Sequence, residues 1–285
     1  MQSIRLTKED SRQGYLMLVA PGHPIPGDMC GRDAGSDCGA EQRYPSAFGY
    51  MNPEQKSPSA PWHIEPVFED YPKIRMESEA AGMLKRALWE IRSGSRIVPV
   101  SGYRSHEEQI RIWEDTMEKE GEIYTRTYVA KPGCSEHESG LAIDLAENRE
   151  EIDFICPEFP EDGICGAFRT IAAHYGFIER YPAGKRMVTG IGAEPWHFRY
   201  VGVPHAWLMK EKGLILEEYL AYLKSETGPG QPFGIDWGNI RIEVFYLDME
   251  KWPEYTLELP KGVPCWVSGT NEGGIVVSVW RNPDA

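Results

Sequence analysis

The chain has 285 residues, enough for one large domain or two smaller ones with a sizeable core. Its 41% hydrophobic and 26% charged residues are typical of an ordinary soluble globular protein. Acidic residues outnumber basic ones by 44 to 30, for a formal net charge of −14, which argues against nucleic acid or an anionic membrane surface as the main partner.

Targeting signals and cysteine usage add further limits. The chain opens without a basic segment followed by an apolar one, and no apolar run approaches the roughly 18 residues of a membrane span. We therefore expect no membrane span in this chain. The six cysteines form no Cys-x-x-Cys pair and are too sparse for a disulfide scaffold. Cys30 with Cys38, and Cys156 with Cys165, could each close a short loop, with free thiols as the alternative.

The first quarter of the chain predicts one strand and a long irregular segment. Residues 14–20 form an apolar run that ends before Pro21 and Gly22, which predicts a buried first strand. Residues 21–72 are rich in Pro, Gly and Asp, and we expect them to wrap the domain with little regular structure.

The next segment predicts a helix, a strand and a second helix. Apolar residues at helical spacing favour a helix over 80–91, and the apolar run that follows predicts a strand at 96–101. Ser105 is then the expected N-cap of a helix, with Glu108 completing a capping box. The residues of this helix expected to face inward are Ile110, Trp113 and Met117.

From residue 143 to residue 224 the sequence predicts both strands and helices, and beyond residue 232 it predicts strands alone. Strands are expected at 143–145, 177–178 and 196–200, and helices at 164–175, 203–211 and 214–224. Gly228 to Pro232 has the composition of a linker. Beyond it, alternation predicts three or more strands, at 240–246, 255–259 and 275–279. We expect an α+β fold, with an antiparallel-sheet domain flanked by helices over 1–227 and a small all-β appendage over 233–285.

Two short motifs carry the chemistry. Residues 135–144 read Ser-Glu-His-Glu-Ser-Gly-Leu-Ala-Ile-Asp, and residues 194–197 read Glu-Pro-Trp-His. A catalytic zinc ion takes three protein ligands from imidazole and carboxylate groups and leaves a fourth position for water. His137, Asp144 and His197 are the predicted ligands. Glu194 is then left as a general base close enough to take a proton from that water.

These motifs resemble the signature of the VanY-like D-alanyl-D-alanine carboxypeptidases, a group that includes VanX-type dipeptidases, phage endolysins and hedgehog-type domains. The block Ser101-Gly-Tyr-Arg-Ser105, followed by Gln109, is similar to the family's upstream substrate-binding segment. The resemblance covers roughly residues 10–210. It implies an antiparallel sheet that bears zinc, and a bacterial enzyme that acts on the cell-wall side if a signal or anchor precedes the chain and in the cytoplasm otherwise.

The resemblance also implies roles for three residues that bind substrate. Arg104 matches the arginine that grips the terminal carboxylate of the peptide or stabilises the oxyanion, since a guanidinium forms a fork with a carboxylate. Gln109 and Ser135 suit hydrogen bonds to the same carboxylate or to the adjoining amide.

We therefore predict a zinc D,D-carboxypeptidase that removes the terminal D-Ala from peptidoglycan stem peptides or their precursors. The enzyme alternatives are a D,D-dipeptidase and an L,D-peptidase or endolysin-type peptidoglycan hydrolase with the same machinery. A different class is a non-catalytic module that keeps zinc for structure. Glu194 argues against that module, because a binding protein has no use for a poised base.

Overall fold

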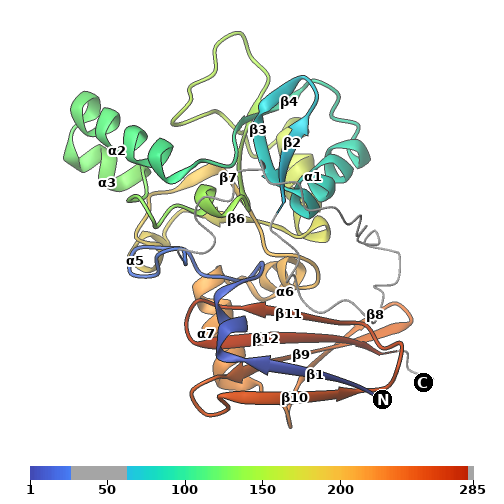
Figure 1. Ribbon diagram of the computed structural model, residues 1–285. Helices are drawn as coiled ribbons and strands as arrows, with labels where there is room; N and C mark the ends of the chain where they lie inside the picture. The colour runs from blue at the N-terminus through green and yellow to red at the C-terminus, as the bar shows by residue number, and fades with distance from the viewer. Residues whose placement is uncertain (27–62, 282–285) are drawn as a thin grey trace. The chain divides into compact units, whose positions relative to one another are not determined.

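The computed structural model describes residues 1–26 and 63–281. By their contacts, the described residues divide into two compact units. The larger unit contains residues 19–26 and 63–215, and the smaller unit contains residues 1–18 and 216–281. Each unit mixes helices with antiparallel strands, which confirms the predicted α+β class (Figure 1).

The larger unit is built around one four-stranded antiparallel sheet with the order β4-β5-β7-β6. A separate hairpin of β2 and β3 leads directly into α1. The strands are β2 (Ile64–Phe68), β3 (Tyr71–Glu77), β4 (Ile97–Ser101), β5 (Ala142–Glu147), β6 (Phe177–Tyr181) and β7 (Glu194–Tyr200). The helices are α1 (Ser78–Glu90), α2 (His106–Glu120), α3 (Glu122–Tyr128), η2 (Glu136–Ser139), α4 (Gly163–Ala172), η3 (Ala173–Tyr175), α5 (Arg186–Thr189) and α6 (His205–Lys212).

Helix α2 begins as predicted, and its most deeply buried residues are polar. Ser105 and Glu108 form the capping box, with the Glu108 amide donating to Ser105 Oγ over 3.2 Å and the Ser105 amide donating to Glu108 Oε2 over 2.8 Å. The residues predicted to face inward, Ile110, Trp113 and Met117, are half-buried, and the fully buried residues of α2 are Gln109 and Thr116. Thr116 donates to the Ile112 carbonyl over 2.7 Å, within the helix, whereas Gln109 donates to the Ala130 carbonyl over 2.8 Å.

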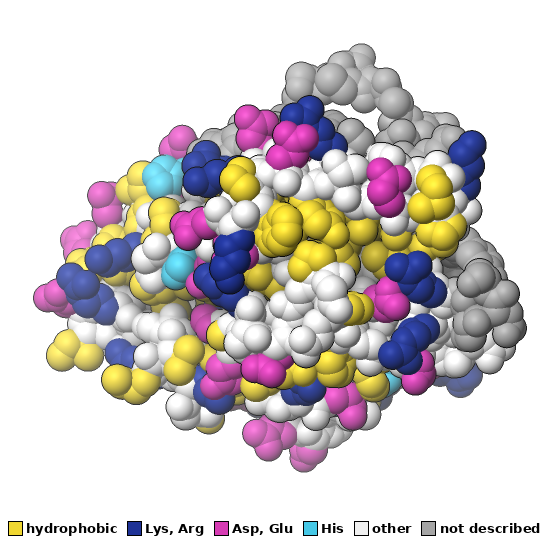
Figure 2. All heavy atoms as spheres, turned by 90° about the horizontal axis from the view of Figure 1, so that it is seen from below, with side chains coloured by type: hydrophobic (Ala, Val, Ile, Leu, Met, Phe, Trp, Pro, Cys, Tyr) yellow, Lys and Arg dark blue, Asp and Glu magenta, His cyan; other side chains and the backbone are white. Residues whose placement is uncertain are grey.

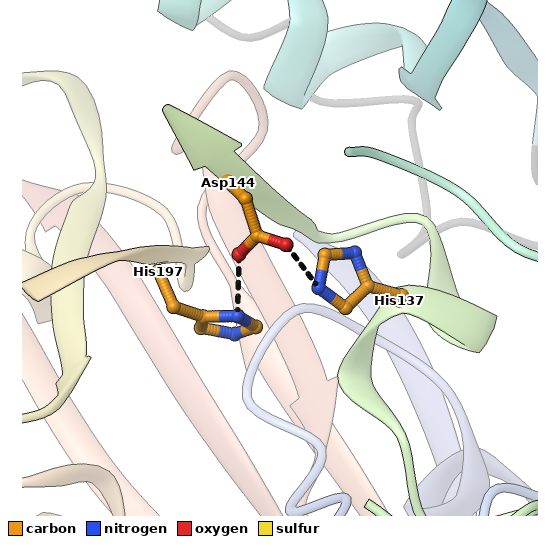
Figure 3. Close-up of side chains that lie close together, drawn as sticks. All are labelled: His137, Asp144 and His197. Atoms are coloured by element: carbon orange, nitrogen blue, oxygen red, sulfur yellow. Dashed lines mark hydrogen bonds and ion pairs between the residues drawn. The ribbon is translucent and has the colours of Figure 1, made fainter. Parts of the chain in front are cut away.

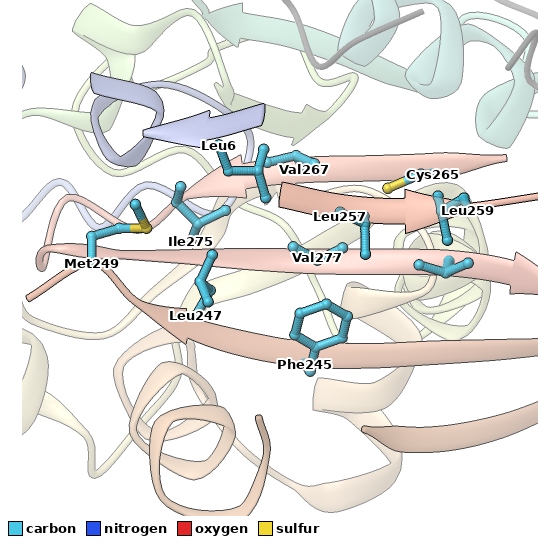
Figure 4. Packing of buried hydrophobic residues seen from close by; sticks show 11 residues of the cluster. Leu6, Phe245, Leu247, Met249, Leu257, Leu259, Cys265, Val267, Ile275 and Val277 are labelled. Atoms are coloured by element: carbon cyan, nitrogen blue, oxygen red, sulfur yellow. The ribbon is translucent and has the colours of Figure 1, made fainter. Parts of the chain in front are cut away.

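The smaller unit contains a four-stranded antiparallel sheet of order β11-β12-β9-β8 and a separate antiparallel pair of β1 and β10. Helix α7 packs on β9. The elements are β1 (Gln2–Thr7), η1 (Lys8–Arg12), α7 (Leu216–Glu226), β8 (Phe233–Trp237), β9 (Ile240–Asp248), β10 (Glu254–Leu259), β11 (Cys265–Gly269) and β12 (Gly274–Arg281). Its core draws on both sheets, as Figure 4 shows for Leu6 of β1, Leu257 of β10 and Val277 of β12.

This smaller unit has other boundaries than the appendage expected from the sequence. Strand β1 pairs with β10 along its whole length, so the N-terminus belongs to this unit. Gly228 to Pro232 is a tight turn and not a linker between units, since Gly228 and Gln231 form an isolated bridge between α7 and β8. Thr227 Oγ1 also accepts a hydrogen bond from the Tyr246 amide over 2.9 Å.

The predicted first strand at 14–20 does not form. These residues are buried, as expected from their apolar character, but they form no continuous ladder: Ala20 bridges His23, and other backbone groups bond to the β11–β12 end. The Leu16 amide donates to Ser268 Oγ over 2.9 Å, and the Leu18 amide donates to the Thr270 carbonyl over 3.0 Å. Partners of this kind hold a buried segment without a continuous strand ladder.

Three further sequence expectations concern cysteines, charge and membrane helices. Cys156 and Cys165 are free thiols, whereas Cys30, Cys38 and most of the predicted wrap at 21–72 lie outside the described residues. Basic and acidic side chains are interspersed on the face shown in Figure 2. Among the described residues, no helix combines the length and the apolar character that crossing a membrane requires.

Candidate active site

His137, Asp144 and His197 converge in the larger unit, and all three are buried. Asp144 lies between the two imidazoles, as Figure 3 shows: its Oδ2 is 3.2 Å from His137 Nε2 and its Oδ1 is 3.0 Å from His197 Nδ1. One potential ligand atom from each residue lies within 4.8 Å of the other two. The structure thus brings together the three residues that the sequence predicted as metal ligands.

The central strands of the sheet explain this convergence. Asp144 of β5 is the register partner of His197 of β7, so that their side chains project from adjacent strands at the same level. His137 lies in the short helix η2, which ends at Gly140 in the left-handed conformation with φ of 73°. That turn, which favours glycine, lets the chain reverse from η2 into β5.

Hydrogen bonds select the nitrogen that each imidazole presents to Asp144. His137 Nδ1 donates to the Gly102 carbonyl over 2.8 Å, which leaves Nε2 facing Asp144. His197 Nε2 lies 3.5 Å from Glu136 Oε2, which leaves Nδ1 facing Asp144. Metal-binding histidines commonly donate their second N–H to a carbonyl or carboxylate in this way. The donor set therefore fits a catalytic zinc ion, which takes imidazole nitrogen and carboxylate oxygen from three residues.

A buried ionic cluster behind His197 was missed by the sequence analysis. Glu136 Oε1 accepts from Arg180 Nε and from Arg199 Nη1, each over 2.8 Å, and all three side chains are inaccessible to solvent. Arg180 comes from β6 and Arg199 from β7. The signal available in the sequence was a glutamate directly before a predicted ligand, but its partners come from distant strands.

The ionisation of these groups follows from their partners. Burial raises the pKa of Glu136, but Arg199 and Arg180 outweigh it and hold the pKa well below its usual range. Burial together with the Arg104 charge lowers the pKa of His137 to about 4. Burial lowers the pKa of His197 as well, but the hydrogen bonds to Asp144 and Glu136 raise it to about 9. The carboxylates of Asp144 and Glu136, which favour positive charge on His197, would also favour a metal cation at this position.

Glu194 lies beside the predicted ligands and is buried, with its Oε2 3.6 Å from His197 Nδ1. Burial raises the pKa of Glu194 to about 8, Asp144 adds to this effect, and the charges of His197 and Arg104 oppose it. A carboxyl group whose pKa lies close to neutral pH is suited to accept and return a proton. The structure therefore gives Glu194 the surroundings of a general base.

Arg104 enters the site from the segment after β4 and is held by several partners. Its Nε and Nη2 donate to Ser101 Oγ over 3.0 and 2.8 Å, and its Nη2 also lies 3.3 Å from Asp144 Oδ2. Its Nη1 donates to Gln109 Oε1 over 3.3 Å. These bonds fix the plane of a guanidinium group that remains 18% exposed, and so available to a ligand.

The two remaining predicted residues differ in access. Ser135 is buried and lines the pocket beside the ligands. Gln109 does not line it, because its amide accepts from Arg104 and donates to the Ala130 carbonyl over 2.8 Å. Gln109 therefore contacts the site through Arg104.

The pocket beside these residues has both polar and apolar lining. Its empty volume is about 480 Å³, which includes the solvent at its open mouth. The polar lining comprises Arg104, Ser135, Glu136, Glu194 and the three predicted ligands. The apolar and aromatic lining comprises Ile112, Tyr128, Val129, Ala130, Phe154, Ile155, Tyr181, Ile191 and Trp196. Such a pocket suits a short ligand with a negative end and small apolar groups.

Comparisons with known proteins agree with this site. Residues 73–203 match the family described as VanY: D-alanyl-D-alanine carboxypeptidase. The chain is 40% identical, over 173 residues, to the bifunctional D-Ala-D-Ala dipeptidase and D-Ala-D-Ala carboxypeptidase VanXYC of Enterococcus gallinarum. That match covers 60% of this chain and 90% of VanXYC.

Solved structures extend the similarity to nearly the whole chain. The vancomycin resistance D,D-dipeptidase VanXYg, in complex with a D-Ala-D-Ala phosphinate analogue, aligns with a TM-score of 0.83 and 36% identity. The alignment covers 98% of this chain and 99% of that one. VanYB in complex with D-alanine-D-alanine aligns with a TM-score of 0.50 and 26% identity, over 73% of this chain and 97% of that one.

Proposed function

The chain belongs to the VanY family of D-alanyl-D-alanine carboxypeptidases, and from this premise we propose that it is a zinc metallopeptidase that cleaves the bond between two terminal D-Ala residues. The observation that carries the proposal is the convergence of His137, Asp144 and His197 beside Glu194 in one pocket. A structural zinc site has four protein ligands and needs no adjacent base, whereas a catalytic one has three. The arrangement therefore favours an enzyme over a zinc-containing binding module.

The metal and Glu194 divide the chemistry between them. When bound by His137, Asp144 and His197, zinc supplies Lewis acidity, which activates water near neutral pH and polarises the peptide carbonyl. Glu194 takes the proton from the attacking water and returns it to the amine of the departing D-Ala. Its surroundings support this role, because burial raises its pKa to about 8 and so makes both the carboxylate and the carboxylic acid accessible.

The polar side of the pocket accounts for recognition of a free C-terminus. Arg104 presents its guanidinium to the substrate carboxylate or to the oxyanion of the tetrahedral intermediate, and Ser101 and Gln109 hold its plane. Ser135 offers a further polar group at the same wall. Gln109 is assigned to support of Arg104, since both ends of its amide are already engaged.

We further propose that the chain accepts both free D-Ala-D-Ala and longer peptides with that terminus, such as peptidoglycan stem peptides or their precursors. The relative that is 40% identical combines these dipeptidase and carboxypeptidase activities, and the similar VanXYg structure is a D,D-dipeptidase. The compartment would be the one that holds such peptides in a bacterial cell, on the cell-wall side if a signal or anchor precedes the chain and in the cytoplasm otherwise.

A direct test compares three peptides with and without a chelator. D-Ala should be released from free D-Ala-D-Ala and from an acylated tripeptide ending in D-Ala-D-Ala, and the matched tripeptide ending in D-Ala-L-Ala should be a poor substrate. A chelator should abolish release and added zinc should restore it. If zinc-loaded protein released D-Ala from neither of the two D,D-substrates, the proposed activity would be refuted.

A further inference from the structure

Glu194 and His197 meet although they are three residues apart on one strand. In a regular strand, side chains separated by three residues point to opposite faces of the sheet. Here Glu194 Oε2 nevertheless lies 3.6 Å from His197 Nδ1. The proposed base therefore lies close to a proposed ligand only because β7 departs locally from regular strand geometry.

That departure is visible in the pairing of β6 with β7. Glu179 pairs with Phe198 and Tyr181 pairs with Glu194, so β7 uses more residues than β6 over the same stretch. Pro195 lies inside this irregular segment and has no amide hydrogen to donate to a neighbouring strand. Irregularities of this kind redirect side chains, but they leave backbone groups that need partners from outside the ladder.

Arg169 of α4 supplies such a partner. Its Nη2 donates to the Pro195 carbonyl over 2.6 Å and to the Phe159 carbonyl over 2.8 Å. Its Nη1 forms an ion pair with Glu179, the residue at which the irregular pairing begins. One guanidinium group thus bridges the irregular part of β7, the adjoining part of β6 and the loop before α4.

The setting of Arg169 makes it rigid. Its side chain is 16% exposed, and its guanidinium carbon lies 5.0 Å from the centre of the Phe159 ring and 5.7 Å from that of Phe198. The planar fork of an arginine can stack on rings and donate in several directions at once, which a lysine ammonium on a flexible stem does less well.

We propose that Arg169 is a positioning residue for the peptidase reaction. By holding the Pro195 carbonyl, it keeps the irregular segment of β7 in the conformation that directs Glu194 toward the proposed metal ligands. Arg169 does not line the pocket and so acts through Glu194, not on the substrate. The inference rests on the proposed function, in which Glu194 is the base.

The central experiment measures the Arg169→Met and Arg169→Lys variants, with Arg86→Met as the control for loss of an exposed helix arginine. Arg169→Met should lower kcat on a D-Ala-D-Ala peptide by about 10- to 100-fold, since a displacement of about 1 Å at a reacting group can cost about 10²-fold. Zinc affinity should stay within about threefold of wild type, because the three ligands keep their own partners. Arg169→Lys should lie between wild type and Arg169→Met, and Arg86→Met should match wild type.

A double-mutant cycle separates positioning from general support of the fold. In a Glu194→Gln background the residual rate no longer depends on where the base lies, so Arg169→Met should lower it by less than about threefold. An equal loss in both backgrounds would overturn the proposal, and so would zinc-loaded Arg169→Met with a kcat within threefold of wild type. If Arg169→Met does not fold, the same cycle with Arg169→Lys decides. A wild-type protein without peptidase activity would instead refute the proposed function.

Discussion

Asp144 and His197 are register partners on the antiparallel strands β5 and β7, and Asp144 Oδ1 lies 3.0 Å from His197 Nδ1. Two proposed ligands that the sequence separates by more than fifty residues are therefore register partners in adjacent strands. Because the backbone ladder fixes their separation, the fold preorganises the proposed metal site. This relationship underlies the predictions that concern zinc.

Glu194→Gln and His197→Ala should separate the base from a ligand. Glu194→Gln keeps the size of the side chain and removes the base, so zinc should remain close to one ion per chain while turnover falls about 10²- to 10⁴-fold. His197→Ala should lose the zinc itself. The measurement is zinc content by elemental analysis beside the steady-state rate, and near-wild-type turnover by Glu194→Gln would show that another group is the base.

Glu136→Gln should weaken zinc binding although Glu136 is not a ligand. The carboxylate that faces His197 Nε2 fixes the orientation of this imidazole, and loss of such a partner typically costs 10- to 100-fold in metal affinity. The variant should also be less stable, because Arg180 and Arg199 lose a buried counter-charge. Zinc affinity of the folded protein is measured by competition with a chelating dye.

Glu138→Gln is the matched control for that substitution. Glu138 is equally buried in η2, but its carboxylate faces His106 and the Gly133 amide, over 2.7 and 2.8 Å, and no predicted ligand. Its zinc affinity should stay close to that of wild type. Equal losses of affinity in both variants would indicate that η2 as a whole, and not the Glu136 contact, governs zinc binding.

Arg104→Lys and Arg104→Ala should selectively impair peptides with a free C-terminal carboxylate. A lysine retains the charge but cannot keep both the bonds to Ser101 and a fork to the substrate, so turnover should fall in both variants. Wild type should process a C-terminally amidated peptide poorly, and Arg111→Ala on the exposed face of α2 should be neutral. If wild type hydrolysed the free-acid and the amidated peptide at equal rates, the proposed contact between Arg104 and the substrate carboxylate would be contradicted.

Glu77 should make the protein less stable as the pH rises from about 5 to about 8. This carboxyl group is 4% exposed at the start of α1, and burial raises its pKa from 4.5 to about 7, against the hydrogen bond from the Ala80 amide. The folded state therefore binds the proton more tightly than the unfolded state. Below pH 4.5, ionisation of Glu77 does not affect the free energy of unfolding. As the pH rises from 4.5 through about 7, this free energy falls by about 3 kcal/mol in all.

Glu77→Gln should remove this dependence. The variant should match wild type near pH 4.5 and exceed its urea midpoint at pH 8, whereas Glu69→Gln on the exposed β2–β3 turn should change stability by less than about 0.5 kcal/mol at either pH. Identical pH profiles for wild type and Glu77→Gln would contradict the prediction.

A truncation that removes the smaller unit should remove both β1 and β10, because the two strands pair with each other. All residues that line the pocket fall between Arg104 and His197, so a chain limited to residues 19–215 should bind zinc and hydrolyse free D-Ala-D-Ala if the larger unit folds alone. A chain that lacks only residues 233–285 should aggregate more than the 19–215 chain. In it, β1 has lost its partner strand β10, and Leu6 has lost the core residues on which it packs. A folded, zinc-loaded and inactive 19–215 chain would make the smaller unit part of the active site.

The sequence by itself determined the parts of this protein that depend on local pattern. The motif that contains His137 and Asp144, together with the motif from Glu194 to His197, predicted the metal site. The capping box at Ser105 predicted the start of α2. The capping box could be predicted because its residues are neighbours in the chain, whereas the two motifs of the metal site lie far apart and were joined through their resemblance to a family signature.

Only the tertiary structure decided which distant groups satisfy one another. The partners of Glu136 come from β6 and β7, Gln109 is turned inward to Arg104 and Ala130, and β1 joins β10 across almost the entire chain. In each case a polar group or strand edge is satisfied by a segment far away in sequence. Local periodicity carries no information about which distant segment this will be, so the pairing appears only once the chain is folded.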